Sequence, residues 1–208
     1  MLVYGIKFMN KYQNNNTICT LLSKSLCDKH FMHNDPNVQG ITRHKYGPIY
    51  DLVFSSIAFK QQRKLNILEI GVSTGISLQI WANLPYVNTV VGVDIIAPTL
   101  ALPTNATFYN QDAYNSDFIT KLKETHGLFD IIIDDGPHSW ESQNFFLNNY
   151  FQLLNTGGVL LCEDMHSSYM HELVKLRDSL HICIFDLRLN YTEDDNDIIA
   201  LRFNDDIY

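Results

Sequence analysis

The chain has 208 residues, of which 46% are hydrophobic and 18% are charged, and its formal net charge at pH 7 is -8. This length suits one domain with a sizeable core, and this composition argues against a disordered chain. An acidic chain is a poor partner for a phosphate backbone, and the sequence contains no run of about 18 apolar residues, so we expect neither a nucleic-acid substrate nor a membrane-spanning helix.

The four cysteines, Cys19, Cys27, Cys162 and Cys183, are far apart and form no Cys-x-x-Cys pair. This spacing predicts neither a zinc site nor a disulfide framework, and it favours reduced, buried thiols. We therefore expect a cytoplasmic protein.

Residues 1–62 are interpreted as an N-terminal helical and loop segment, and residues 63–208 as the core of a single domain over 1–208. Apolar residues at helical spacing predict helices over 17–30 and 48–61. The polar stretch 33–43 between them is expected to be a loop.

From Leu65 onward, short apolar runs alternate with amphipathic segments. The runs predict strands at 66–70, 89–94, 107–109, 128–134 and 158–163, and the segments between them predict helices at 76–83, 116–124 and 140–154. Strands and helices that alternate in this way form right-handed β-α-β units and a parallel sheet with helices on both faces.

The end of the chain departs from this alternation. After a predicted helix at 169–179, strands at 180–189 and 197–203 follow each other with only a polar turn at 190–196 between them. Consecutive strands without an intervening helix most simply form an antiparallel pair. A mostly parallel seven-stranded sheet that ends in such a hairpin is the Rossmann-like fold of class I methyltransferases, which use S-adenosylmethionine (SAM).

A glycine-rich turn follows the first predicted strand, in the sequence Glu69-Ile-Gly71-Val-Ser73-Thr-Gly75. Glycine lets the backbone approach a ligand closely, and open α/β sheets bind ligands where the strand order reverses. Asp94 ends the next predicted strand, at a spacing that suits a carboxylate bound to ribose hydroxyls. Structural glycines would explain the turn alone, whereas the turn together with these acids predicts a nucleoside cofactor.

Asp112 follows the third predicted strand, where an acid can meet the amino group of adenine; the alternative is that it caps the helix near Ser116. NAD is the competing cofactor, because its first β-α-β unit looks similar. The turn reads E-x-G-x-S-x-G rather than G-x-G-x-x-G, and the predicted sheet ends in a hairpin, so SAM is favoured.

Two acidic pairs, Asp134-Asp135 and Glu163-Asp164, follow two predicted strands that we expect to be neighbours. Carboxylates that converge at one sheet edge repel each other unless a cation or a proton neutralises them, and oxygen ligands favour Mg²⁺ or another hard divalent ion. His138 lies three residues after Asp135 and is placed to act as general base for a substrate hydroxyl. The alternative is that these acids cap the following helices and that one of them binds the amine of the cofactor.

Three stretches carry a resemblance to the macrocin/mycinamicin sugar O-methyltransferase family, over roughly His44 to His166. LEIGVSTGISLQIWANLPYVNTVVGVDI and FDIIIDDGPHSWESQNFFLNNYFQLLNTGGVLLCEDMH are similar to that family, and HKYGPIYDLVF resembles its upstream H-x-Y-x-x-x-Y segment. The resemblance implies a SAM- and Mg²⁺-dependent methylation of a hydroxyl on a deoxysugar attached to a larger molecule.

Site residues follow by position in the resembling motifs. The resemblance implies that Asp135, Glu163 and Asp164 are metal ligands, that His138 is the base, that Glu69, Gly71, Asp94 and Asp112 bind SAM, and that Tyr46 lies near the cofactor or the acceptor. To these we add Ser73, Gly75 and Asp134 as cofactor-binding residues and Asp135 as a catalytic residue.

Two departures from the family leave the acceptor and the assembly open, including a homo-oligomer. Pro137 replaces the small polar residue usual before the histidine, and the long N-terminal region of some members has no counterpart. A catechol-type O-methyltransferase is the nearest alternative. An RNA cap 2′-O-methyltransferase is disfavoured by the net charge and by the lack of a lysine after Glu163-Asp164, and an inactive SAM-binding module by the complete set of acids and histidine.

Overall fold

The computed structural model describes residues 18, 21–22, 46–187 and 198–204. The chain divides into two compact units, Met1–Gln62 and Arg63–Tyr208. The division falls at the predicted boundary between the N-terminal segment and the core, while the interpretation of the whole chain as one domain stays a prediction. Most of the predicted helix over 17–30, the loop over 33–43, His44 and the turn over 190–196 lie outside the described residues.

In the first unit, helix α3 spans Gly47–Gln61 and carries Pro48 in its first turn. Proline suits this position because N–H groups in the first turn have no partner within the helix. The side chain of Asp51 accepts a hydrogen bond of 2.6 Å from the backbone N–H of Ile18. The predicted helix over 48–61 is confirmed.

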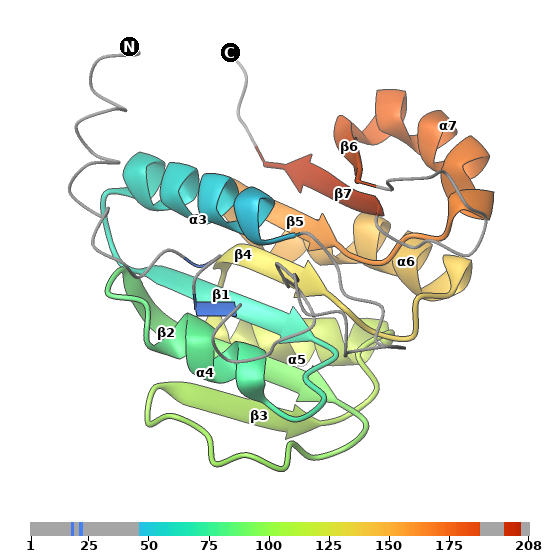
Figure 1. The fold of residues 1–208 in the computed structure, drawn as a ribbon. Coiled ribbons are helices and arrows are strands. Elements are labelled where there is room, and N and C mark those ends of the chain that lie inside the picture. Colours follow the sequence, from blue (N-terminus) through green and yellow to red (C-terminus); the bar gives the residue numbers. More distant parts are fainter. Residues whose placement is uncertain (1–17, 19–20, 23–45, 188–197, 205–208) are drawn as a thin grey trace, which may run out of the picture. The chain divides into compact units, whose positions relative to one another are not determined.

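The second unit contains a seven-stranded sheet in the order β3-β2-β1-β4-β5-β7-β6 (Figure 1). Five strands are parallel: β1 (Leu65–Ile70), β2 (Val87–Asp94), β3 (Ala106–Asn110), β4 (Phe129–Asp134) and β5 (Leu154–Cys162). Strand β7 (Ile198–Phe203) lies antiparallel between β5 and β6 (Ile182–Asp186). The predicted mostly parallel sheet with a terminal antiparallel hairpin is confirmed.

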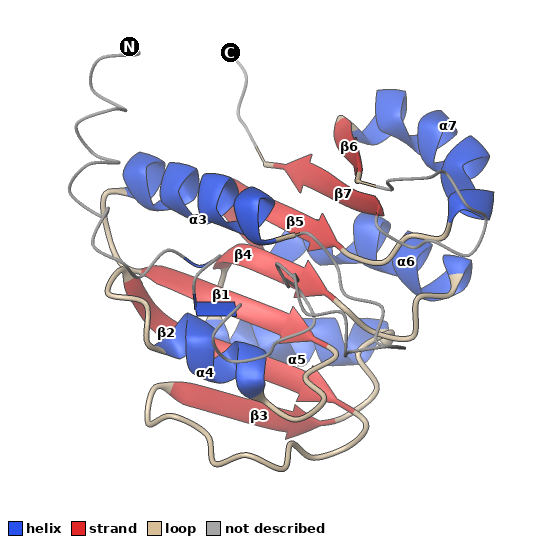
Figure 2. Ribbon diagram, viewed as in Figure 1, coloured by secondary structure: helices blue, strands red, loops and turns tan. Residues whose placement is uncertain are grey.

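Helices of the second unit cover both faces of this sheet (Figure 2). Helix α4 (Ile76–Ala82) lies on one face, and α5 (Ser116–His126) and α6 (Trp140–Asn149) lie on the other. The remaining elements are the 3-10 turns η1 (Tyr150–Leu153) and η2 (Ser167–Tyr169) and helix α7 (Met170–Leu180). Among the described residues, no helix has the length and the apolar character needed to cross a membrane.

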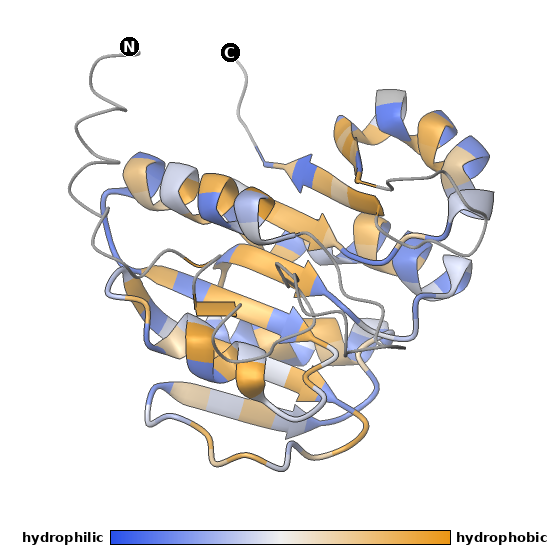
Figure 3. Cartoon of the chain, viewed as in Figure 1, coloured by the Kyte–Doolittle hydropathy of each residue, from blue (hydrophilic) through white to orange (hydrophobic). Residues whose placement is uncertain are grey.

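Alternate residues along the central strands pack against opposite helical layers, as the pleat of a strand requires. Leu68 of β1 and Ile132 of β4 belong to the same buried cluster as Phe146 of α6. On the opposite face, Gly92 of β2 makes room for α4, because an added Cβ would lie 2.6 Å from a methyl group of Leu78. Hydrophobic residues dominate β4 and β5 (Figure 3), as expected for parallel strands buried on both faces.

Some predicted boundaries are wrong. The predicted helix over 140–154 ends at Asn149, and β5 begins at Leu154 instead of residue 158. Gly157 has a φ of 76°, and the register between β4 and β5 shifts at this level, so the strand starts before the glycine pair and passes it in an irregular segment. Nearer the carboxyl terminus, α7 extends to Leu180. The predicted strand over 180–189 is therefore shorter and corresponds to β6.

Candidate active site

The second unit's predicted site residues lie at the carboxyl edge of the sheet, at or just after the ends of the parallel strands. From β1 the chain adds β2 and then β3 on one side of the sheet, and it then returns to place β4 on the other side of β1. The strand order therefore reverses between β1 and β4. Open α/β sheets bind ligands at such a reversal. The geometry of this edge therefore decides what the protein can bind.

The glycine turn after β1 is in close contact with the loop after β4. Gly71 has a φ of 80°, and a Cβ at this position would collide with the backbone carbonyl of Asp135. The N–H of Asp135 in turn donates a hydrogen bond of 2.9 Å to the carbonyl of Ile70. The first glycine of the turn is thus needed to bring the predicted cofactor loop and the predicted metal loop together.

Asp94 fixes the same turn from the end of β2. Its Oδ2 accepts hydrogen bonds from the N–H groups of Val72 (2.8 Å) and Ser73 (2.9 Å), and its Oδ1 accepts one from Ile96 (2.9 Å). Ser73 and Gly75 have left-handed backbones, with φ of 50° and 93°. A carboxylate offers about four acceptor positions, so these bonds leave room for a ribose hydroxyl. The roles of Asp94, Ser73 and Gly75 in binding SAM stay predictions.

Glu69, the acid before the glycine turn, is fully buried at the end of β1. One of its carboxylate oxygens accepts a hydrogen bond of 3.0 Å from the indole nitrogen of Trp81 in α4. This bond joins the turn to the helix that follows it. Tyr46 directly precedes α3 in the first unit. The predicted cofactor contacts of Glu69 and Tyr46 are not tested by these placements.

Asp112 closes a short turn after β3, where its Oδ1 accepts a hydrogen bond of 2.9 Å from the N–H of Tyr114. The cap of α5 is Asn115, whose side chain accepts from the N–H of Asp117. The alternative in which Asp112 caps this helix is therefore wrong, because a residue nearer to the helix start fills that position. Its contact with adenine stays a prediction.

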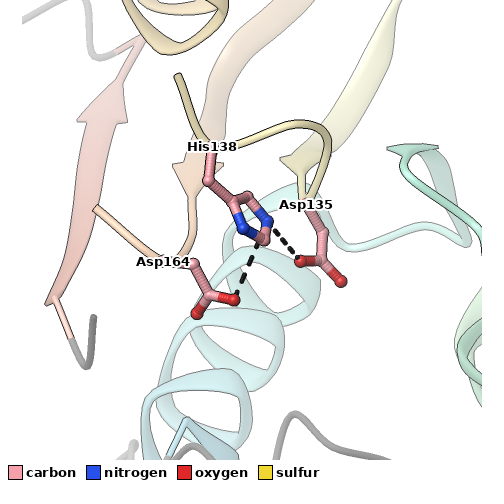
Figure 4. Close-up of side chains that lie close together, drawn as sticks. All are labelled: Asp135, His138 and Asp164. Atoms are coloured by element: carbon pink, nitrogen blue, oxygen red, sulfur yellow. Dashed lines mark hydrogen bonds and ion pairs between the residues drawn. The ribbon is translucent and has the colours of Figure 1, made fainter. Parts of the chain in front are cut away.

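The side chains of Asp135, His138 and Asp164 converge at the carboxyl ends of β4 and β5 (Figure 4). Each offers one ligand atom, and these atoms all lie within 4.8 Å of one another. The Nε2 atom of His138 lies 3.2 Å from Oδ1 of Asp135 and 3.7 Å from Oδ2 of Asp164. We predicted that the two acidic motifs and the histidine meet, and these three residues do.

Two of these three residues have an uncommon backbone conformation. His138 has a φ of 56° and Asp164 a φ of 51°, in the left-handed region that residues other than glycine rarely adopt. Gln143 of α6 is buried and donates hydrogen bonds to the carbonyls of Glu163 (2.9 Å) and Asp164 (3.3 Å), which fixes the turn after β5. Strained backbones that surrounding contacts hold in place are concentrated at functional sites.

The helices after these acids are capped by other residues. Ser139 caps α6, since its hydroxyl accepts a hydrogen bond of 3.2 Å from the N–H of Ser142. His166 caps η2 through a bond of 3.1 Å from the N–H of Ser168. The alternative in which the acids serve as helix caps is therefore wrong for these two elements.

In each acidic pair, one member belongs to the group of three and the other does not, whereas we predicted that all four carboxylates meet. Asp134 is buried and accepts hydrogen bonds from the hydroxyl of Tyr114 (2.5 Å) and the thiol of Cys162 (3.7 Å). Glu163 is buried and lies outside the group of three. Both pairs stand where their strands end, and the left-handed backbone of Asp164, with a φ of 51°, takes the turn after β5 out of the alternation of a strand. The roles of Asp134 in cofactor binding and of Glu163 as a metal ligand stay predictions.

Burial and mutual charge set the proton affinities at this edge. Burial raises the pKa of Asp134 to about 7, against the opposing effect of the Tyr114 hydrogen bond. Burial lowers the pKa of His138, but the hydrogen bond to Asp135 and the negative charges of Asp164 and Asp135 outweigh it, so the pKa is raised overall. A proton on His138 and a bound cation are therefore two ways to neutralise the same pair of carboxylates.

The donor atoms fit a divalent cation. Mg²⁺ binds oxygen atoms at about 2.1 Å in octahedral geometry, which places neighbouring ligand atoms about 3 Å apart. The ligand atoms of Asp135 and Asp164 lie within 4.8 Å of each other, which is compatible with contact of both to one ion. Since hard cations prefer carboxylate oxygens to imidazole, Asp135 and Asp164 are the ligands that suit Mg²⁺, and His138 is left for proton transfer.

Sequence analysis missed Tyr114 and Gln143, which hold the two site loops. Tyr114 packs against the loop after β4. Its hydroxyl donates a hydrogen bond to Asp134, and a Cβ at Gly136 would collide with that hydroxyl. The glycine directly after the acidic pair is the one sequence signal of this contact. Gln143 lies 20 residues from its partner Glu163, a separation that leaves no local pattern.

The strand order, the terminal hairpin and the site at the reversal point define the fold of class I SAM-dependent methyltransferases. No protein-family model matches the sequence. The chain is similar to the solved structure of the MycE methyltransferase from the mycinamycin biosynthetic pathway in complex with Mg and SAH. The TM-score is 0.68, at 20% sequence identity, over 90% of this chain and 54% of that one.

The sequence is similar to curated sugar O-methyltransferases. It is 28% identical over 133 residues to demethylmacrocin O-methyltransferase of Streptomyces fradiae, which covers 61% of this chain and 33% of that protein. It is 31% identical over 118 residues to L-olivosyl-oleandolide 3-O-methyltransferase of Streptomyces antibioticus, which covers 52% of this chain and 30% of that protein. The matched part spans about a third of the length of these relatives. The resemblance to sugar O-methyltransferases that the motifs predict is confirmed.

Proposed function

We propose that the protein is a SAM- and divalent-metal-dependent O-methyltransferase that methylates a hydroxyl of a sugar, on a glycan or a glycosylated small molecule. The observation that carries this proposal is the convergence of Asp135, His138 and Asp164 beside the glycine turn at the point where strand order reverses. The names of the similar proteins, which are sugar O-methyltransferases, support the choice of acceptor.

The two halves of the site have separate tasks. The turn from Gly71 to Gly75, fixed by Asp94, would hold SAM, and Asp135 and Asp164 would hold the divalent cation. When bound, SAM supplies the methyl group and the cation supplies a Lewis acid that lowers the pKa of an acceptor hydroxyl. The close contact between Gly71 and the backbone of Asp135 keeps the SAM-binding turn beside the metal-binding loop.

His138 would take the proton of the acceptor hydroxyl on its Nε2 atom. The hydroxyl oxygen forms a bond to the methyl carbon as the carbon–sulfur bond of SAM breaks, and the electron pair of that bond stays on sulfur. The products are a methyl ether, S-adenosylhomocysteine and one proton on His138. Asp135 and Asp164 both contact this same Nε2 atom, at 3.2 Å and 3.7 Å, so their engagement with a cation would leave Nε2 available to the hydroxyl. Alignment of the reacting groups supplies much of the acceleration in a displacement reaction.

We further expect the enzyme to work in the cytoplasm, where the free thiols of Cys162 and Cys183 stay reduced. A glycan or glycoside acceptor also agrees with the net charge of -8, which disfavours a nucleic-acid substrate.

The direct test is a screen of nucleotide sugars and glycosides with radiolabelled SAM, with and without EDTA. We expect label on at least one sugar, loss of transfer in EDTA and recovery on addition of Mg²⁺. Label on catechol and on no sugar would support the catechol-type alternative. Full transfer in EDTA would contradict the metal-dependent mechanism, and SAM binding without transfer to any acceptor would favour a binding module.

A further inference from the structure

The carboxyl edge of the sheet has a part that all predicted cofactor residues of the second unit except Asp134 leave unused. The predicted SAM-binding residues Gly71, Asp94 and Asp112 follow β1, β2 and β3, which lie on one side of the strand order. The cluster of Asp135, His138 and Asp164 follows β4 and β5 on the other side. An acceptor whose hydroxyl reaches this cluster must therefore extend over the loops after β4 and β5.

Three aromatic rings lie along the segments that follow β4 and β5, and Tyr169 contacts the other two. We call them the aromatic wall: Trp140, His166 and Tyr169. Trp140 is the first residue of α6, and its ring lies 5.6 Å from that of Tyr169, at an interplanar angle of 45°. The ring of His166 lies 5.8 Å from that of Tyr169, at 59°. The wall thus joins the loop that follows β4 to the loop that follows β5.

The wall is within reach of the cluster. Trp140 follows His138 by two residues, and His166 follows Asp164 by two residues. Because an extended chain spans at most about 3.5 Å per residue, each of these pairs of Cα atoms is at most about 7 Å apart. These backbone separations are within the length of one sugar ring with its hydroxyls.

The wall offers both apolar surface and a polar donor. All three rings are partly exposed. The Nδ1 atom of His166 accepts a hydrogen bond from the N–H of Ser168, so the proton of the neutral imidazole is on Nε2. The hydroxyl of Ser168 lies 2.7 Å from the same Nδ1 atom. Small-molecule sites combine aromatic surface with a few placed polar groups in this way.

We propose that the aromatic wall binds the sugar ring of the acceptor and presents its hydroxyl to the cluster of Asp135, His138 and Asp164. A pyranose has an apolar face of C–H groups and a polar rim of hydroxyls. The C–H face packs on Trp140 and Tyr169, and His166 donates from Nε2 to a hydroxyl on the rim. This inference rests on the proposed function for the identity of the acceptor.

The test uses the full chain with S-adenosylhomocysteine and Mg²⁺, and methyl α-L-rhamnopyranoside and methyl β-D-glucopyranoside as probes. Selective irradiation of aromatic protons in an NMR saturation-transfer experiment should transfer saturation to the ring protons of at least one glycoside. Trp140→Ala and Tyr169→Ala should weaken that binding about three- to tenfold, since an aromatic contact contributes about 0.5–1.5 kcal/mol beyond its buried area. Tyr169→Phe should retain it.

Tyr109→Ala is the matched control, because Tyr109 is also a partly exposed ring with aromatic neighbours, at 5.7 Å and 5.6 Å. It should leave glycoside binding unchanged, and all variants should bind S-adenosylhomocysteine as the wild type does. If Trp140→Ala does not fold, Tyr169→Ala in the 3-10 turn decides the question alone. No saturation transfer in the wild type, or unchanged glycoside binding in Tyr169→Ala, would overturn the wall. Glycoside binding without methyl transfer would refute the proposed reaction and leave the wall standing.

Discussion

The two ends of β4 carry buried acids that have different kinds of partner. At its start, Asp130 is fully buried and binds the guanidinium of Arg63 through two contacts of 2.6 Å and 2.9 Å, with further hydrogen bonds from the N–H of Asn66 and the amide of Asn155. At its end, Asp134 is bound by a hydroxyl and a thiol, and the following Asp135 lies beside His138.

The difference separates a stabilising acid from acids available for chemistry. The guanidinium of Arg63 binds both oxygens of Asp130 and keeps its own positive charge, because arginine stays protonated. Hydroxyl, thiol and imidazole partners leave the charge at the other end dependent on protons and cations. We therefore expect the acid at the amino edge of the sheet to act in stability, and those at the carboxyl edge to exchange protons and bind metal.

The largest effect is expected from His138→Ala at the carboxyl edge. If His138 is the general base, methyl transfer should fall by about a hundred- to ten-thousand-fold while the affinity for SAM stays near that of the wild type. Turnover of the wild type should rise with pH through the histidine range, and this rise should be absent in the variant. Steady-state rates against pH, with calorimetry of SAM binding, measure both. A loss below about tenfold with an unchanged pH profile would remove His138 from the mechanism.

At the amino edge, Arg63→Ala should destabilise the fold without affecting catalysis. It leaves the charge of Asp130 buried with fewer partners, and we expect about 2–3 kcal/mol, below the usual 3–5 kcal/mol for a broken buried pair, because the Arg63 side chain is 43% exposed. Urea unfolding measures the loss. Lys175→Ala, in the exposed pair with Glu172, is the control and should change little. Equal stability of the Arg63 and Lys175 variants would refute the contrast between the two ends.

Asp134 should make the metal-free protein less stable as pH rises. Its pKa is about 7 in the folded chain and about 4 in the unfolded chain, so between these values the folded state holds the extra proton and stability falls with increasing pH. The raised pKa of His138 acts in the same direction at the upper end of this window. Urea unfolding in EDTA at about pH 5 and about pH 8 should show the fall, and Asp134→Asn should reduce it. An identical fall in the variant would assign the effect to other groups.

The smallest effect concerns Gly136 and Tyr114. Gly136→Ala should destabilise the protein because the new methyl group meets the Tyr114 hydroxyl. Tyr114→Phe should cost about 1 kcal/mol through the lost hydrogen bond to Asp134. In the double variant the clash is relieved, so its loss of unfolding free energy should be smaller than the sum of the losses in the two single variants. Additive losses in urea unfolding would show that an alanine side chain at position 136 does not contact the Tyr114 hydroxyl.

Sequence analysis predicted the sheet well because buried parallel strands leave continuous apolar runs. The strands that end at Ile70, Asp94, Asp134 and Phe203 were predicted with these carboxyl ends, and the site residues follow such ends. The error at the start of β5 arose because the Asn155-Thr-Gly-Gly stretch resembles a turn, while the strand passes it with a shifted register. Local pattern identifies a strand but not an irregularity inside it.

The side-chain partners within the site could not be predicted, because they are distant in sequence. Tyr114 and Asp134 are 20 residues apart, and Arg63 and Asp130 are 67 apart, so neither pair leaves a periodic signal. The acidic pairs misled for a related reason. Adjacent letters suggest a shared position, but only one member of each pair belongs to the group of three. Strand alternation would have paired Asp135 with Glu163, because Asp134 lies opposite Cys162. The left-handed backbone of Asp164 has no sequence signal.

The central claim is that the acids at the carboxyl ends of β4 and β5 bind a divalent cation. Calorimetric titration of the metal-free protein with Mg²⁺ tests it most directly, in the wild type, in Asp164→Asn and in Arg63→Ala as the control from the opposite edge. The account predicts one bound ion in the wild type and the control, and at least about tenfold weaker binding in Asp164→Asn, since removal of a charged ligand costs more than about 1.4 kcal/mol. Equal Mg²⁺ affinity in all three proteins, or no binding in the wild type, would contradict it.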